Sequence, residues 1–95
     1  MAVNTWQGST GDWGTNGNWS DSKPNAGDKI IFDASDVTSV TEGMLPSETG
    51  NIEYDLIHIK KGYSGSIGSA AEPLSVGTAS AAFPIIIEGT GTYYI

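Results

Sequence analysis

The chain has 95 residues, with eleven acidic side chains, four lysines and a formal net charge of −7. This balance offers no basic stripe for nucleic-acid phosphates and no attraction to an anionic membrane surface. Cysteine is absent, which excludes a disulfide framework, a zinc ribbon and a thiol nucleophile.

The length allows one domain with a thin core. No stretch repeats apolar residues at helical spacing over three turns. Short β-branched runs are instead separated by glycine-containing turns, which is typical of a sandwich, a barrel or a solenoid. We therefore predict a single all-β domain over 1–95. It is either a parallel β-helix or solenoid, or a small β-sandwich, with a loop segment at 1–27 and a strand region at 28–95.

The loop segment between Trp6 and Pro24 is dense in glycine, asparagine and aspartate, which favour tight turns. A loop this polar cannot bury itself, so large aromatic side chains are expected to hold it against the domain. Trp6, Trp13 and Trp19 are therefore predicted to be packing residues of a cap on the strand region. The alternative is an aromatic platform that stacks on a sugar ring.

Four oxygen-bearing side chains lie within ten residues of this loop: Asp12, Asn16, Asn18 and Asp21. Calcium prefers such oxygen ligands on flexible loops, which makes the four weak calcium candidates. Their spacing does not match an EF-hand, and short polar side chains in such loops more often cap turns. Turn capping is the favoured interpretation, and no cofactor is predicted.

The turn before the first predicted strand has a specific geometry. Gly27 follows Pro24 and Asn25, so the chain must reverse there and become extended within two residues. Glycine adopts the positive φ that such a reversal needs without steric cost. Asp28 is expected to accept hydrogen bonds from backbone amides of the turn.

Strands are predicted wherever short β-branched or alternating runs are bounded by turn residues. In the first predicted strand, Asp28–Asp33, Ile30 and Phe32 lie on one face and Ile31 lies on the other. The segments are Asp28–Asp33, Val37–Thr41, Leu56–Lys60, Leu74–Val76, Ile85–Glu88 and Tyr93–Ile95.

Two features of the C-terminal half suggest stacking or assembly. Apolar positions recur at an offset of 18 residues, for example Leu56 with Leu74, as in the turns of a solenoid. The sequence ends within an apolar strand, and an uncovered strand invites pairing. We expect this end either to be tucked into an oligomer or to continue into a longer β-structure. The predicted assembly residues are Tyr93, Tyr94 and Ile95.

Catalytic patterns are weak. His58 is the only histidine, and alternation places it opposite Ile57 and Ile59 as a half-buried structural residue. No nucleophile elbow occurs in the segment 62–66. Carboxylate pairs such as Glu53 with Asp55, or Asp28 with Asp33, are common in any acidic protein. No catalytic residue is predicted.

The N-terminal segment contains a series of glycine, tryptophan and aspartate motifs. They are Asn4-Thr5-Trp6-Gln7-Gly8, Gly11-Asp12-Trp13-Gly14, Gly17-Asn18-Trp19-Ser20, Pro24 and Gly27-Asp28-Lys29-Ile30-Ile31-Phe32-Asp33. These motifs resemble the opening of β-solenoid segments in bacterial surface proteins, autotransporter-like passengers and tailed-phage structural proteins. The resemblance implies a parallel β-helix-like or related all-β structural module on a virion or cell surface, often trimeric, and it transfers no catalytic residue to a position of this chain.

These observations favour two functional hypotheses over a third, an enzyme fragment of a pectate-lyase-like β-helix. The third is the weakest because it needs calcium and basic catalytic residues, and the chain contains no arginine. The first is a non-enzymatic structural protein, such as a phage capsid decoration or fibre-base module, that forms a homo-oligomer, with a trimer favoured. Its partners would be further copies and other capsid or surface proteins, and neither nucleic acid nor membrane. The second is a carbohydrate-binding module that uses the tryptophan faces.

Overall fold

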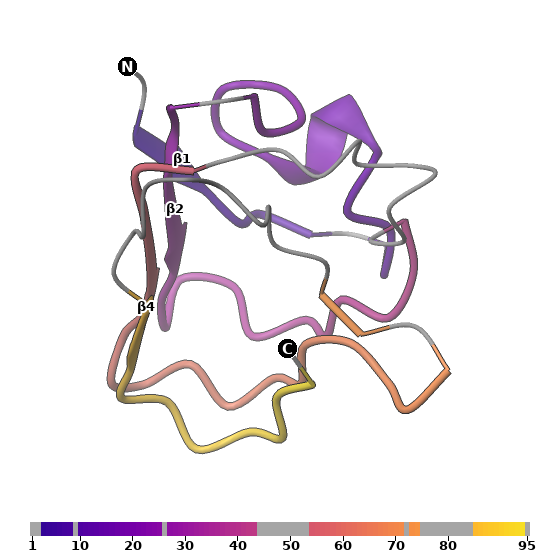
Figure 1. Cartoon of the computed structure of the whole chain (residues 1–95), viewed down its shortest axis with the longest axis vertical. Helices are drawn as coiled ribbons and strands as arrows, with labels where there is room; N and C mark the ends of the chain where they lie inside the picture. Colours follow the sequence, from indigo (N-terminus) through magenta and orange to yellow (C-terminus); the bar gives the residue numbers. More distant parts are fainter. Residues whose placement is uncertain are drawn as a thin grey trace, which may run out of the picture.

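Four short strands form one sheet in the computed structural model, which describes residues 3–8, 10–25, 27–43, 54–71, 73–74 and 85–94. All neighbouring strands are parallel, and their order in the sheet follows the chain (Figure 1). The only helix within these ranges is the 3-10 turn η1 (Asn16–Asn18). The prediction of an all-β protein is confirmed at this level. The strands are β1 (Val3–Thr5), β2 (Lys29–Phe32), β3 (Leu56–Ile59) and β4 (Ile85–Ile87).

The register of the sheet gives the number of sequence positions that separate paired residues in neighbouring strands. Val3 lies beside Lys29, 26 positions later, and Lys29 lies beside Leu56, 27 positions later. Ile57 lies beside Ile85, 28 positions later. The predicted 18-residue offset is therefore wrong as a description of neighbouring segments. It aligned apolar runs in sequence, whereas the neighbours in the sheet are residues 26–28 positions apart.

Side chains alternate across the sheet as predicted. Ile30 and Phe32 on β2, and Ile57 and Ile59 on β3, are completely buried on the inner face. His58 lies between the two β3 isoleucines in sequence and is half-buried on the outer face. Of the predicted strand segments, 28–33, 56–60 and 85–88 match observed strands to within one residue at each end.

A second column of contacts lies away from the sheet. Val40 forms an isolated parallel bridge with Ile67, and Ile67 forms another with Tyr93. The predicted strand Val37–Thr41 is wrong, because only its Val40 forms a bridge in this column. Asp36 explains the difference: its carboxylate accepts a hydrogen bond from the Thr38 amide at 2.9 Å, which forms a turn where a strand was expected.

The remaining predicted strands are short contacts or fall outside the described residues. The Leu74 amide donates to the Tyr94 carbonyl oxygen at 2.8 Å, but neither residue lies in a strand. Ser75, Val76 and Ile95 lie outside the described residues. Strand β1 was not predicted, because its three residues include two polar ones, Asn4 and Thr5.

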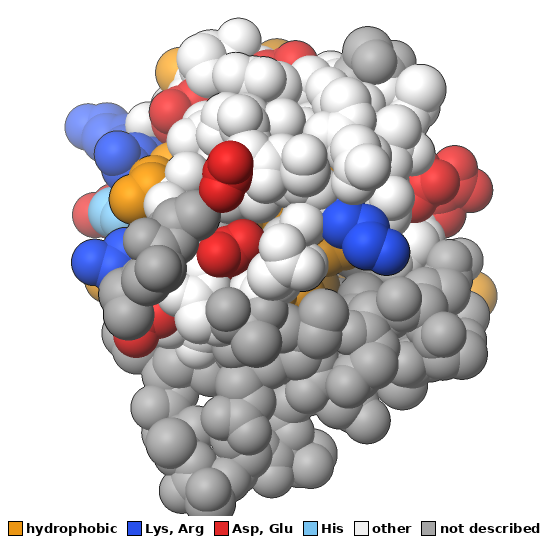
Figure 2. Space-filling view, turned by 90° about the horizontal axis from the view of Figure 1, so that it is seen from above, with side chains coloured by type: hydrophobic (Ala, Val, Ile, Leu, Met, Phe, Trp, Pro, Cys, Tyr) orange, Lys and Arg blue, Asp and Glu red, His pale blue; other side chains and the backbone are white. Residues whose placement is uncertain are grey.

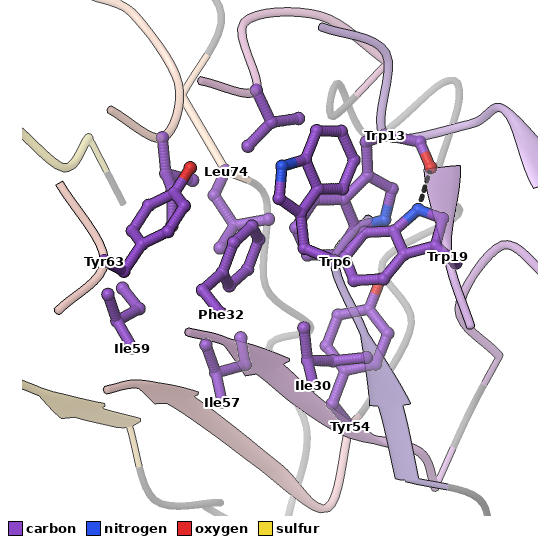
Figure 3. Packing of buried hydrophobic residues seen from close by; sticks show 12 residues of the cluster. Trp6, Trp13, Trp19, Ile30, Phe32, Tyr54, Ile57, Ile59, Tyr63 and Leu74 are labelled. Atoms are coloured by element: carbon purple, nitrogen blue, oxygen red, sulfur yellow. Dashed lines mark hydrogen bonds between the residues drawn. The ribbon is translucent and has the colours of Figure 1, made fainter. Parts of the chain in front are cut away.

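The core lies between the inner face of the sheet and the loops opposite it (Figure 3). Its buried hydrophobic residues come from every layer of the chain, and Tyr93 packs against them as a half-buried side chain. They are Trp6, Trp13, Trp19, Ile30, Phe32, Val40, Tyr54, Ile57, Ile59, Tyr63, Ile67 and Leu74.

Candidate functional site

Three tryptophans form a buried aromatic plug at the β1 end of the core. Trp6, Trp13 and Trp19 are 0%, 2% and 3% exposed. The Trp19 ring meets the other two edge-on, with centroids 5.1 Å from Trp6 and 4.8 Å from Trp13. The Trp19 indole N–H donates to the Trp13 carbonyl oxygen at 2.7 Å (Figure 3). These rings are part of the core and present no exposed platform to a ligand.

Phe32 joins this plug to the strands. Its ring centroid lies 5.7–6.1 Å from those of the three tryptophans and 5.1 Å from that of Tyr63. Rings at such separations attract one another beyond the effect of their buried area. The aromatic loop is thus held on β2 by the side chain that β2 points into the core.

The loop also covers the outer edge of β1. The Ser20 amide donates to the Thr5 carbonyl oxygen at 3.0 Å, and the Ser20 hydroxyl accepts from the Thr5 amide at 2.9 Å. The Gln7 amide donates to the Asn18 carbonyl oxygen at 2.7 Å, and Trp6 forms an antiparallel bridge with Trp19. These contacts occupy backbone groups that an edge strand would otherwise offer to another chain.

Asn4 fixes the loop from within β1. Its buried side-chain amide donates to the Ser22 carbonyl oxygen at 2.6 Å and accepts from the Asp21 amide at 2.9 Å. Ser22 has a φ of 61°, which is uncommon for a residue with a side chain. Sequence reasoning missed both Asn4 and Ser20. For Asn4, a signal was present in the sequence. When residues 3–6 are aligned with residues 29–32, Asn4 falls at the inner-face position of Ile30.

The weak calcium candidates take part in the turns of this loop. Asp12 accepts a hydrogen bond from the Gly14 amide at 2.8 Å, and Asn16 accepts one from the Lys23 amide at 3.2 Å. The buried Asn18 amide donates to the Asp12 carbonyl oxygen at 2.9 Å, and the Asp21 side chain is exposed. An amide nitrogen that donates cannot face a cation, so the geometry of Asn18 suits turn capping.

Strand β4, at the opposite end of the sheet, leaves its apolar residues exposed. Ile85, Ile86 and Ile87 are 37%, 41% and 50% exposed. Ile85 and Ile87 are in register with the completely buried Ile57 and Ile59. They therefore occupy inner-face positions that the described residues leave partly uncovered. Of the predicted C-terminal assembly residues, Tyr93 is half-buried and Tyr94 exposed.

The outer face of the sheet carries basic and apolar groups. His58 Nε2 lies 2.6 Å from Glu88 Oε1 in an exposed contact. Figure 2 shows the histidine and several lysine side chains on one side of the molecule, beside hydrophobic groups. Exposed pairs of this kind contribute about 0–1 kcal/mol, so this contact orients the side chains more than it stabilises the fold.

Two of the carboxylates considered as catalytic pairs accept hydrogen bonds from turn amides. Asp28 accepts from the Asn25 amide at 2.9 Å, and Asp33 accepts from the Ser35 amide at 2.9 Å. Glu53, the proposed partner of Asp55, lies outside the described residues. Among the described side chains, no group of three or more histidines, aspartates and glutamates is placed to hold a metal ion.

Two buried tyrosines have perturbed ionisation. Burial raises the pKa of Tyr54 to about 12, an effect that the neighbouring Trp13 partly offsets. Burial also raises the pKa of Tyr63, with smaller contributions from Tyr93 and Asp36. Both hydroxyls therefore stay neutral across the physiological range, as core groups do.

Within the described ranges, no helix has the length and apolar character needed to cross a membrane. Comparisons with protein-family models, with curated proteins and with solved structures find no match for this chain.

Proposed function

We propose that this protein is a non-enzymatic structural module: a short parallel β-solenoid that is covered at one end, open at the other, and built to assemble into a homo-oligomer. The observation that carries the proposal is the contrast between its two end strands. Backbone and side-chain hydrogen bonds cover the outer edge of β1, whereas β4 exposes three isoleucines.

The spacing of contacts favours a solenoid over a sandwich. Partners in the sheet are 26–28 positions apart, and in the second column Val40 and Ile67 are 27 apart and Ile67 and Tyr93 are 26 apart. One spacing on two sides of the core is expected when each turn of chain contacts only the next. Sandwiches are built from antiparallel sheets, whereas all four strands here are parallel.

The resemblance noted in the sequence supports a location on a virion or cell surface. Its proposed partners are further copies of the chain and other capsid or surface proteins. The carbohydrate-binding alternative needs exposed tryptophan faces, and all three rings are buried. The proposal therefore assigns the tryptophans to packing and no reaction to the chain.

The experiment that tests the proposal is a measurement of solution mass by light scattering at micromolar concentration. We expect an oligomer, because a thin core without disulfides gains stability when its exposed apolar end is covered. A monomer with ordinary thermal stability would contradict the assembly function. A glycan-dependent change in tryptophan fluorescence would support the carbohydrate-binding alternative.

A further inference from the structure

The outer edge of β4 presents backbone groups in a defined pattern. The Glu88 amide donates to the Ile59 carbonyl oxygen at 2.8 Å, so Glu88 directs its backbone groups toward β3. Backbone groups alternate between the two edges of a strand, so those of Ile85 and Ile87 point away from β3. None of the described residues forms a hydrogen bond with these outward groups.

The inner-face side chains at this end of the sheet are hydrophobic and partly exposed, so an additional strand could cover them. Ile85 and Ile87 continue the inner-face rows that contain Ile57 and Ile59, but they are 37% and 50% exposed. Tyr93 ends the second column in the same way and is half-buried, whereas Ile67 before it is completely buried. Both walls of the core therefore end in incompletely covered hydrophobic residues.

The other end of the sheet cannot supply the missing strand. A head-to-tail stack would pair β4 of one copy with β1 of the next. The outer edge of β1 is already occupied at Thr5, because Ser20 bonds to both backbone groups of this residue and so interrupts the edge that a further strand would need. An interface between identical copies must then use the same edge twice, which is the arrangement of a two-fold dimer.

We propose that β4 pairs antiparallel with β4 of a second copy, about a two-fold axis that passes beside Ile86. This inference rests on the proposed assembly function and specifies its interface. In this register, Ile85 of each copy lies opposite Ile87 of the other. The outward amide and carbonyl groups of these residues then form two hydrogen-bonded pairs, and Ile86 faces its own counterpart as the non-hydrogen-bonded pair.

The register also suits the side chains and charges. The two-fold axis is perpendicular to the sheet, so both inner faces lie on the same side and the two cores meet. Antiparallel pairing places the two Glu88 carboxylates at opposite ends of the paired strands. The remaining repulsion comes from the net charge of −7 on each copy. Because salt screens such repulsion, we expect the dimer to tighten as ionic strength rises.

The first test removes one outward backbone donor. Ile87→Pro lacks an amide N–H that the β3–β4 contact does not use, so the internal sheet should persist. We expect its solution mass to fall from two chains to one, with an unchanged circular dichroism spectrum. Ile87→Lys should also give a monomer. Val3→Lys is the matched control, because Val3 is a 60% exposed strand residue at the covered end, and this variant should remain a dimer.

The second test exploits the absence of cysteine in the natural chain. Non-hydrogen-bonded antiparallel partners have Cα atoms about 4.5 Å apart, which a disulfide can bridge. Ile86→Cys should therefore form a covalent dimer under mild oxidation, whereas Val3→Cys should stay a single chain. Because each variant has one thiol, every cross-link must join two copies.

The outcomes separate this inference from the proposed function. A dimer that Ile87→Pro disrupts and Ile86→Cys traps supports β4 pairing. A trimer, or any oligomer whose mass Ile87→Pro leaves unchanged, overturns the pairing but retains the assembly function. A wild-type monomer at micromolar concentration overturns both.

Discussion

Trp6 and Tyr63 donate hydrogen bonds to the same acceptor, the carbonyl oxygen of Thr38. The distances are 2.8 Å from Trp6 Nε1 and 2.7 Å from Tyr63 Oη. Trp6 follows β1, Thr38 lies in the loop after β2, and Tyr63 follows β3. The Thr38 carbonyl oxygen therefore connects three segments of the chain, which follow β1, β2 and β3 and are separated by 25 or more residues.

Removing one of these donors should weaken the fold modestly. Tyr63→Phe keeps the buried ring and deletes the hydroxyl, so we expect a loss of about 1 kcal/mol in the free energy of unfolding. Urea denaturation of the variant and the parent measures this difference. Tyr94→Phe is the control, because Tyr94 is 41% exposed, and it should leave the midpoint unchanged. Equal midpoints for Tyr63→Phe and the parent would contradict the assigned role.

Truncating the aromatic plug should be far more costly. Trp19→Ala removes a ring that contacts Trp6, Trp13 and Phe32, and we expect a loss of about 3–5 kcal/mol. Thermal melting followed by circular dichroism measures the effect. Lys23→Ala, an exposed change in the same loop, should melt like the parent. If Trp19→Ala also melts like the parent, Trp19 is not a packing residue.

The turn before β2 should depend on both of its predicted features, which the structure confirms. Gly27 has a φ of 82°, and Asp28 Oδ2 accepts from the Asn25 amide at 2.9 Å. A Cβ at Gly27 would meet no atom within 4 Å, so Gly27→Ala should cost about 1 kcal/mol or more from backbone strain alone.

Substitutions at Asp28 separate its hydrogen bond from its charge. Asp28→Asn retains an acceptor for the Asn25 amide, so it should be less destabilising than Asp28→Ala. Chemical denaturation of both variants measures the order. If Asp28→Asn instead abolished a calcium-dependent gain in stability, Asp28 would be a metal ligand and the turn-capping interpretation would be wrong.

Two glycine corners approach each other closely at successive layers. A Cβ at Gly91 would overlap the backbone of Gly65, and that clash cannot be relieved by turning a side chain. Gly91→Ala should therefore cost about 1–3 kcal/mol through overpacking. Gly17→Ala is the matched control, because its Cβ would meet nothing within 4 Å. Equal melting temperatures for the two variants would show that the corners are free to separate.

Alkaline pH should destabilise the protein through Tyr54. Its pKa is raised to about 12 in the folded state, so between pH 10 and 12 the unfolded chain releases a proton that the folded chain retains. The contribution of Tyr54 is fully present below pH 10 and falls by about 1.4 kcal/mol per pH unit across this window. Tyr54→Phe should flatten this part of the stability profile. An unchanged slope in Tyr54→Phe would assign the loss to other groups, such as Tyr63.

Local residue preferences were enough to predict several local features of this protein. Alternation placed Ile30 and Phe32 on one face of β2, and Ile57 and Ile59 on one face of β3. The residues around Gly27 specified a reversal with positive φ, and the polar loop required tryptophans to hold it against the core. Such features depend on the conformational preferences of a few neighbouring residues, and those preferences are present in the sequence.

Which segments lie side by side depends on long-range contacts that no local pattern predicts. The offset of 26–28 positions, the strand β1 and the contact column of Val40, Ile67 and Tyr93 depend on pairing between residues far apart in the chain. Asn4 shows why: a polar residue in a short strand has no local preference to be buried. It is buried because folding brings Asp21 and Ser22 within hydrogen-bond distance of its side chain, which satisfies the amide away from water.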